Sequence, residues 1–428
     1  MRMSKSFRIN NKCFELGRES IKLGNILVSG PYSEYREMIL EAILGDSLAN
    51  NGSAIVFQNG NAMKLNNYIK ELTRYTTGCS TSLLYDLANN DYSSGGIDLL
   101  KGLSNGERAD IIIEFVESFN SEIKNESLEF FRMHLSNVVD VLDILNDPYT
   151  VLSFENLKYF TAEWLKTKAK VLLKKKLINQ ARADDIEYYA DSYVPMHKSY
   201  EYEYKDFCNQ IEKNSVAQTL SNGISVEDML NDCCLSVISL DFLRREKLSK
   251  AIMKTLMKMM IYWMPRVVSC SSVVFEDLDD QEIPEIKDFM ANCISSDRVT
   301  VVMTVNNLTK FSETWDPLSY SDTYFVYQQV KPDNRALWAQ MSGTYMSNQK
   351  SLTYSNPLGS SIGADLVANV IGLKTTRDHT ISKVEKTFLE EQDFSSLKVN
   401  ECYFMSRKNI IRSGRRGPER MYFVKLSI

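Results

Sequence analysis

The sequence predicts an α/β protein whose mostly parallel central sheet is interrupted by an all-helical domain. Short apolar runs bounded by Gly, Asn or acidic residues occur towards both ends of the chain, as is typical of strands buried on both faces of a parallel sheet. Between them, helical periodicity and long charged stretches dominate. The 428 residues suffice for two or three domains. We expect residues 1–105 and 266–428 to form the α/β core, with a C-terminal β-hairpin, and residues 106–265 to form the helical insertion domain.

The first core segment is expected to contain a hairpin and a strand–helix–strand unit. "SFRINNKCFELG" alternates with period two around an Asn-Asn turn, which predicts the hairpin. "ILVSG" predicts a strand that leads into a helix over 36–48, and "GSAIVFQNG" predicts the next strand. A strand, a helix and a strand in succession form a right-handed βαβ unit.

Helices dominate the middle of the chain, and strands return after it. Apolar stripes at helical spacing predict helices over 107–123, 128–145, 155–185 and 241–264. Three later strands are predicted within 267–280, 298–307 and 323–330. The last stretch, "VNECYFMSRKNIIRSGRRGPERMYFVKL", predicts two strands around a basic Arg-Arg-Gly-Pro turn.

Composition limits the possible functions. The formal net charge of −5 excludes a global basic field, so any nucleic-acid contact would come from a local patch. Lys166, Lys170 and Lys174 share one face of a predicted helix and could follow a DNA backbone, although such a face is also typical of plain solvated surface.

No metal site and no membrane span are expected. The eight Cys lack pairs at C-x2-C spacing and only three His are present, which argues against zinc and favours reduced thiols. No apolar run approaches the roughly 18–20 residues of a membrane helix, and the N-terminal stretch lacks the apolar core of a signal peptide. We expect a cytoplasmic protein that meets membranes only through partners.

The stretch "ILVSGPYSEYRE" begins as a phosphate-binding loop begins. Such a loop has the form G-x-x-x-x-G-K-[ST]: its backbone N–H groups surround phosphate, its Lys neutralises charge and its hydroxyl binds Mg²⁺. Gly30 fits the first glycine and Pro31 follows it. Tyr35, Arg36 and Glu37 stand in place of the second Gly, the Lys and the hydroxyl residue, so bulk and negative charge replace the phosphate cradle.

Two later strand ends carry the polar residues that ATP hydrolysis would need. "VVFEDLDD" ends an apolar strand in Glu276-Asp277, where P-loop ATPases place an Asp that orients Mg²⁺ and then a Glu that polarises water. The order is inverted here, and adjacent strand residues face opposite ways. Asn306 ends the next strand, at the usual place of a γ-phosphate sensor. An acidic loop and a turn-forming Asn are the alternative interpretations.

Together these stretches resemble the HerA–FtsK superfamily of P-loop ATPases, and most closely the coupling ATPases of type IV secretion and conjugation. The similarity rests on "ILVSGP" before a helix, "AIVFQNGN", a helical insertion, "VVFEDLDDQEIPEIKDFMANCISSDRVTVVMTVNNLTKF" and a late "VNECYFMSRKNIIR". Asn306 stands where the family has Gln. The resemblance implies a RecA-like core.

Members of this family usually form rings that move DNA or protein, and a neighbouring subunit supplies an arginine to the nucleotide. By position, Arg412, Arg415 and Arg416 are the candidates here, although a solvated hairpin tip is an equal alternative. The resemblance also implies oligomers, with copies of this chain or with an intact ATPase paralogue, acting on DNA or a secreted protein.

Three functions follow as hypotheses. The first is a degenerate, non-hydrolysing subunit or scaffold in a transfer machine. The second is an active motor in which Arg36 replaces lysine and Glu276 with Asp277 binds metal. The third is an interaction module that uses no nucleotide. No cofactor is expected unless the altered loop still works, in which case ATP and Mg²⁺ would bind.

Overall fold

A computed structural model describes most of the chain. It places side chains in residues 24–60, 96–147, 149–213, 216–232, 234–278, 283–294, 298–308, 317–342 and 388–406, and backbone alone in strands 6–9, 12–15, 82–86, 344–355, 376–387 and 422–425. Among these residues, no helix combines the length and apolarity that crossing a bilayer requires.

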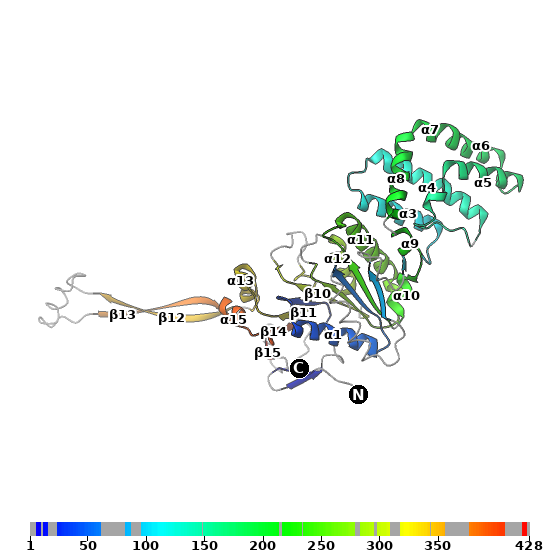
Figure 1. Ribbon diagram of the computed structural model, residues 1–428. Helices are drawn as coiled ribbons and strands as arrows, with labels where there is room; N and C mark the ends of the chain where they lie inside the picture. Colours follow the sequence, from blue (N-terminus) through cyan, green and yellow to red (C-terminus); the bar gives the residue numbers. More distant parts are fainter. Residues whose placement is uncertain are drawn as a thin grey trace, which may run out of the picture.

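The core is an eleven-stranded mixed sheet (Figure 1). Its order is β2 (Lys12–Glu15), β1 (Ser6–Ile9), β15 (Tyr422–Lys425), β14 (Glu401–Ser406), β11 (Thr323–Val326), β3 (Ile26–Ser29), β10 (Val299–Val305), β9 (Ser271–Glu276), β4 (Ala54–Asn59), β8 (Leu235–Leu240) and β5 (Ser82–Asp86). All neighbours from β11 to β5 pair in parallel, and the pairs from β2 to β11 are antiparallel. The predicted α/β class with a mostly parallel sheet is confirmed.

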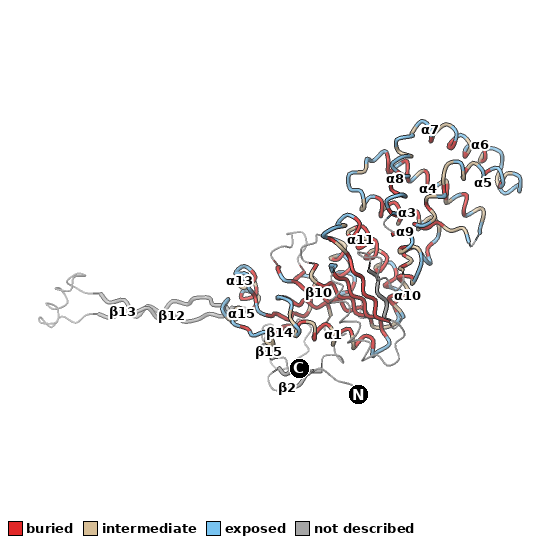
Figure 2. Tube along the Cα trace, viewed as in Figure 1, coloured by how far each residue is buried: buried red, intermediate tan, exposed pale blue. Residues whose placement is uncertain are grey.

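Helices cover both faces of the sheet. On one face, α1 (Glu34–Ala49) packs its apolar residues against alternate residues of β3, β4, β8, β9 and β10. The opposite face packs against α11 (Glu246–Trp263), α12 (Pro284–Ile294) and α13 (Pro332–Met341). The strands are therefore buried on both sides, which Figure 2 shows as continuous red, and this burial explains their unbroken apolar sequences.

A helical lobe, which we define as residues 105–219, stands beside the sheet (Figure 1). It contains α3 (Asn105–Phe119), α4 (Asn125–Leu145), η3 (Leu157–Tyr159), α5 (Ala162–Lys174), α6 (Gln180–Tyr188), η4 (Tyr189–Tyr193), α7 (Val194–Met196), α8 (Lys198–Lys213) and α9 (Val216–Thr219). The two ends of the lobe meet where β6 (Ile97–Asp98) pairs with β7 (Ile224–Ser225), just before α10 (Val226–Asn231).

A buried histidine connects the layers of this lobe. His134 of α4 lies 2.6 Å from the carbonyl oxygen of Phe160 through Nε2 and 3.0 Å from the hydroxyl of Tyr189 through Nδ1. A carbonyl only accepts, so Nε2 carries the proton and Nδ1 accepts from the tyrosine. Burial lowers the pKa of His134, which keeps the ring neutral.

The structure corrects two expectations about the middle of the chain. Residues 106–265 are not all helical, because β8 lies within that range and pairs with β4 and β5, and α11 packs on the sheet before the 3₁₀ turn η5 (Met264–Arg266). The six residues of β8 lack the flanking Gly or Pro that would mark a strand in sequence. The single helix predicted over 155–185 is wrong, since it divides into η3, α5 and α6 with new caps at Thr161 and Asn179.

Both predicted hairpins are confirmed, and a third was not foreseen. β1 pairs antiparallel with β2, and β14 pairs antiparallel with β15. The unforeseen ribbon consists of β12 (Thr344–Ser355) and β13 (Thr376–Thr387), which pair antiparallel along their whole length. It follows α13, precedes α15 (Glu391–Ser395) and projects away from the core on the side opposite the helical lobe (Figure 1).

Candidate functional site

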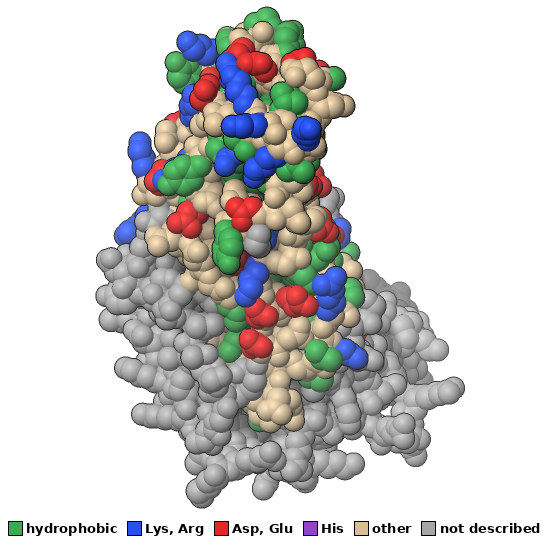
Figure 3. Space-filling view, turned by 90° about the vertical axis from the view of Figure 1, so that its right-hand side faces the viewer, with side chains coloured by type: hydrophobic (Ala, Val, Ile, Leu, Met, Phe, Trp, Pro, Cys, Tyr) green, Lys and Arg blue, Asp and Glu red, His purple; other side chains and the backbone are tan. Residues whose placement is uncertain are grey.

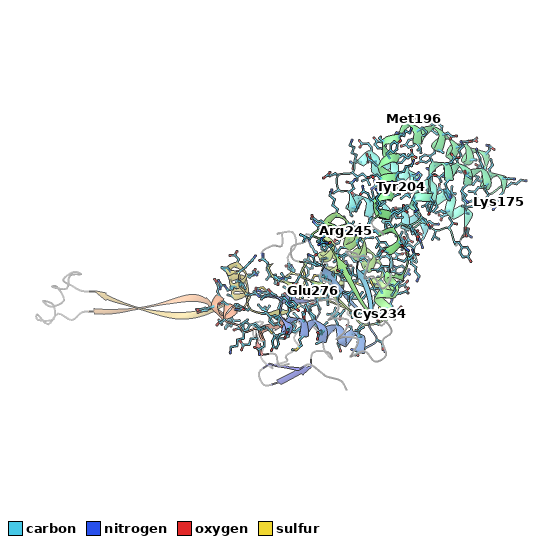
Figure 4. All side chains as sticks on the ribbon, in the orientation of Figure 1. Lys175, Met196, Tyr204, Cys234, Arg245 and Glu276 are labelled. Carbon is cyan, nitrogen blue, oxygen red and sulfur yellow. The ribbon has the colours of Figure 1, made fainter. Side chains whose placement is uncertain are left out.

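The carboxyl ends of three neighbouring parallel strands bring the predicted site residues together. β3 ends before Gly30, β9 ends at Glu276, and β10 ends before Asn306. The backbone N–H of Gly30 donates to the carbonyl of Val305 at 2.9 Å, which ties the loop to the neighbouring strand. In Figure 4, Glu276 is labelled inside the core, far from the helical lobe. This edge is where open α/β sheets commonly bind ligands.

The loop after β3 is short and internally bonded. Only Gly30 to Ser33 separate the strand from α1, and the Ser33 hydroxyl caps the helix by accepting from the Arg36 backbone N–H at 3.1 Å. Gly30 adopts φ +136°, and a Cβ there would lie 2.7 Å from Cβ of Tyr327. Glycine is therefore required, for backbone conformation and for close approach to β11. Pro31 is exposed in the loop.

Arg36 occupies the centre of this edge. Its side chain is fully buried, although it stands in the first turn of α1. Nη1 donates to the carbonyl of Gly30 at 3.0 Å and to Oδ1 of Asn306 at 3.3 Å. Nη2 donates to Oδ2 of Asp277 at 2.6 Å and lies 4.0 Å from Oε1 of Glu276. The guanidinium thus links the loop to both later strand ends.

A left-handed residue brings both carboxylates to the same cation. Adjacent residues of a regular strand point to opposite faces, but Asp277 lies just beyond β9 with φ +52°. Thr304 of β10 holds it, since the Asp277 N–H donates to Oγ1 of Thr304 at 2.9 Å and that hydroxyl donates back to Oδ1 at 3.1 Å. Nδ2 of Asn306 also donates to Oδ1, at 3.1 Å. Glu276 is 2% exposed. The inverted acidic pair therefore forms one cluster with Arg36.

Glu37 interacts with a tyrosine in the loop. Partial burial and the neighbouring Glu37 carboxylate, which accepts a hydrogen bond from Tyr32, raise the pKa of Tyr32 to about 12. The same ring lies beneath the guanidinium of Arg36, whose central carbon is 5.7 Å from the ring centroid. Tyr35, in the first turn of α1, packs against the core, and its carbonyl accepts from the Tyr327 hydroxyl at 2.9 Å.

A second polar network extends the site towards α13. None of its residues was predicted as a site residue from the sequence. Asn334 of α13 donates through Nδ2 to the carbonyl of Asn306 at 3.3 Å and to Oε1 of Gln329 at 3.4 Å. Gln329 in turn donates to the carbonyl of Ser29 at 3.1 Å, and Nε1 of Trp338 donates to Oγ of Ser29 at 3.3 Å. Polar residues in "YQQVKPDN", directly after a buried strand, were the available signal.

The remaining predicted residues lie elsewhere. Lys166 lies 2.6 Å from Oδ2 of Asp191, and Lys170 lies 3.5 Å from Oε1 of Glu187, so the two lysines face acids of η4 and α6. Lys174 is exposed at the end of α5. The three arginines at 412, 415 and 416 fall outside the described residues. The strand that precedes them, β14, ends at Ser406, which pairs with Thr323. Thr323 begins β11, so β14 ends at the amino-terminal edge of the parallel strands.

Comparisons with known proteins identify the fold. No family model and no curated protein matches the chain. Among solved structures, it is similar to the bacterial conjugative coupling protein TrwBdeltaN70 in an unbound form (TM-score 0.55, 10% identity, covering 100% of this chain and 90% of that chain). It is also similar to plasmid coupling protein TrwB in complex with the GTP analogue GDPNP (0.56, 10%, 100% and 90%) and to VirB4 of Thermoanaerobacter pseudethanolicus (0.52, 10%, 94% and 89%). This chain therefore has a RecA-like P-loop fold similar to that of TrwB and VirB4, as its strand-end sequences predicted.

Proposed function

We propose that this chain is a coupling-ATPase-like subunit whose own nucleotide site is closed by an internal ion cluster. It would act as a non-hydrolysing subunit or scaffold in a machine that transfers DNA or protein. The observation that carries this proposal is the fully buried Arg36 guanidinium, which bonds Gly30, Asp277 and Asn306. These are the positions that a nucleotide and its metal would have to contact.

The energetics of the cluster oppose nucleotide binding. A triphosphate with Mg²⁺ would have to separate Arg36 from Asp277, because both need the same strand-end space. Removing one partner of a buried ion pair costs about 3–5 kcal/mol, which corresponds to a loss of about 10²–10⁴ in affinity. New contacts to phosphate would have to exceed this cost.

The loop itself lacks the features of a phosphate cradle. A working loop directs free N–H groups at the phosphates, whereas here the Gly30 carbonyl faces the guanidinium, the Gly30 N–H bonds Val305, and Ser33 takes the Arg36 N–H. Glu37 places a carboxylate, already bonded to Tyr32, where a metal-binding hydroxyl would stand. The charge there would repel phosphate.

An active motor is the second candidate, and one observation favours it. Asp277, the sensor-position Asn306 and Arg36 are hydrogen-bonded to one another at the carboxyl edge of the sheet, and Glu276 lies 4.0 Å from the same guanidinium. If Arg36 turned from Asp277 towards a γ-phosphate, Asp277 and Glu276 would be available to Mg²⁺ through oxygen ligands. The coupling protein TrwB has itself been solved in complex with ADP and Mg²⁺.

Calorimetry with ATP and Mg²⁺ on the full chain tests the proposal. We expect no binding heat at millimolar nucleotide from protein that melts cooperatively, and no phosphate release. Arg36→Lys is the informative variant, because it keeps the charge but loses the forked contacts. ATP hydrolysis by the unmodified chain that disappears in Asp277→Asn would refute the proposal and establish the motor.

A second measurement distinguishes the proposed scaffold subunit from an interaction module that does not assemble with an ATPase. Sedimentation of the chain alone and with an intact P-loop ATPase from the same transfer system reports its partners. We expect a mixed oligomer, with the arginines at 412, 415 and 416 facing the neighbour's nucleotide. Replacing all three with Gln should then lower the partner's ATPase rate. A chain that remains monomeric in every mixture contradicts the scaffold.

A further inference from the structure

The far end of the helical lobe carries three consecutive lysines on a tightly built helix end. After α5, the Leu177 N–H donates to the carbonyl of Leu172 at 3.0 Å and the Lys176 N–H donates to that of Leu173 at 2.9 Å. Lys176 has φ +59°. This is the Schellman pattern, in which Gly or Asn normally occupies the left-handed position. A lysine in that position is conformationally unfavourable.

These lysines are available to a partner outside the chain. Lys174, Lys175 and Lys176 are all exposed, and none forms an ion pair with any residue that the structure describes. Lys166 and Lys170, earlier on the same helix, face Asp191 and Glu187 instead. Two lysines of α5 therefore have acidic partners, whereas the three at its end have none among the described residues. Figure 4 labels Lys175 at the extremity of the lobe.

Exposed aliphatic side chains accompany the lysines. Val171 is 40% exposed and Leu177 is 53% exposed. Leu177 follows the left-handed residue, a position whose side chain usually packs back on the helix. Figure 3 faces the lobe from this side and shows hydrophobic side chains among the Lys and Arg side chains of its upper part. Cations with aliphatic neighbours, and without exposed aromatic rings for base stacking on this turn, fit a lipid interface better than a nucleic acid.

We propose that this tip, defined as Val171, Lys174, Lys175, Lys176 and Leu177, docks on an anionic phospholipid surface. The ammonium groups lie at the level of the lipid phosphates and carboxylates while Leu177 and Val171 enter the interface, as long basic side chains commonly do. Three lysines give weak binding for one copy, so the contact becomes strong only when several copies meet one surface. It is independent of the nucleotide site.

Vesicle co-sedimentation of the full chain tests this docking. Vesicles of phosphatidylcholine with about 30% phosphatidylserine imitate an anionic leaflet, and pure phosphatidylcholine is the reference. We expect binding to the anionic vesicles alone. Replacing Lys174, Lys175 and Lys176 with Gln should weaken the partition coefficient about fivefold for each lysine, or about 100-fold together. Leu177→Ser should weaken it about tenfold without changing any charge.

A matched variant controls for net charge, and a second ligand separates lipid from nucleic acid. Replacing Lys198, Lys213 and Lys247 with Gln removes the same charge from exposed positions elsewhere and should leave binding unchanged. Melting temperatures of all variants exclude unfolding, because lysines near a helix C-terminus also interact with the helix dipole. Equal binding to both vesicle types overturns the proposal. So does binding insensitive to Leu177→Ser, or a tip that binds a short DNA duplex and not vesicles.

Discussion

The carboxyl edge of the sheet and the helical lobe use charged side chains in opposite ways. At the sheet edge, Arg36 is fully buried and bonds residues that directly follow three separate strands. In the lobe, the lysines of α5 lie on the surface, where Lys170 meets a single acid and Lys174 meets none of the described residues. A buried charge must be satisfied within the fold, whereas an exposed one can serve a partner. The difference suggests that the sheet edge holds the structure together and the lobe makes external contacts.

The largest expected effect comes from removing the buried cation. Arg36→Ala leaves Asp277 and Glu276 without their guanidinium and should lower the free energy of unfolding by about 3–5 kcal/mol. Urea denaturation measures it. The control is Arg182→Ala, which breaks an exposed pair with Asp140 and should cost less than about 1 kcal/mol. Similar values for the two variants would remove the contrast between the regions.

The next effect concerns the loop that precedes Arg36. Gly30→Ala should cost about 1–3 kcal/mol, because φ +136° and the approach to Tyr327 both exclude a Cβ. Gly45→Ala within α1 is the matched control. It has nothing within 4 Å of a new Cβ and should stabilise the helix by up to about 1 kcal/mol. Thermal unfolding compares the two, and a tolerated Gly30→Ala would show that the loop can relax.

A pH-dependent effect is expected inside the lobe. Burial lowers the folded-state pKa of His134 below its ordinary 6.5, so the unfolded chain takes up the proton first as pH falls. The stability that neutral His134 contributes is present above pH 6.5 and declines below it, by at most about 1.4 kcal/mol per pH unit. Comparing the chain with His134→Gln at pH 7.5 and 5.5 isolates this contribution. Parallel stability curves for the two proteins would contradict it.

The smallest effect is expected at the paired lysines of α5. Lys170→Gln removes one member of a surface ion pair and should change the free energy of unfolding by no more than about 0.5 kcal/mol, with any effect reduced by added salt. Denaturation at low and high salt measures it. A large effect would mean that the surface of the lobe, like the sheet edge, depends on its charge pairs.

Much of the core could be predicted from sequence, and the exceptions have physical causes. Strands such as β3, β9 and β10 appear as apolar runs because both faces of the sheet are covered. β8 is equally buried, but no turn residues flank it and the sequence on both sides has helical periodicity. It was therefore not predicted as a strand. α5 was expected to continue to residue 185, yet a lysine adopts the left-handed conformation that ends it, and propensity does not predict that.

The candidate site was predictable as a set of residues but not as an arrangement. Gly30, Glu276, Asp277 and Asn306 stand at strand ends, and parallel pairing brings such ends to one edge. The inverted acidic order suggested side chains pointing apart. The left-handed Asp277 removes that conflict, and backbone conformations of this kind are set by local packing, here by Thr304.

The sequence by itself determined the sheet class, the two terminal hairpins and the chemical identity of the loop, because burial periodicity and turn chemistry are local properties. Only the tertiary structure decided what Arg36 does, since its partner Asp277 is 241 positions away along the chain. It likewise decided which lysines of α5 are neutralised, because their acids belong to the following helices. Pairing between distant segments depends on how the layers pack, and no local pattern records it.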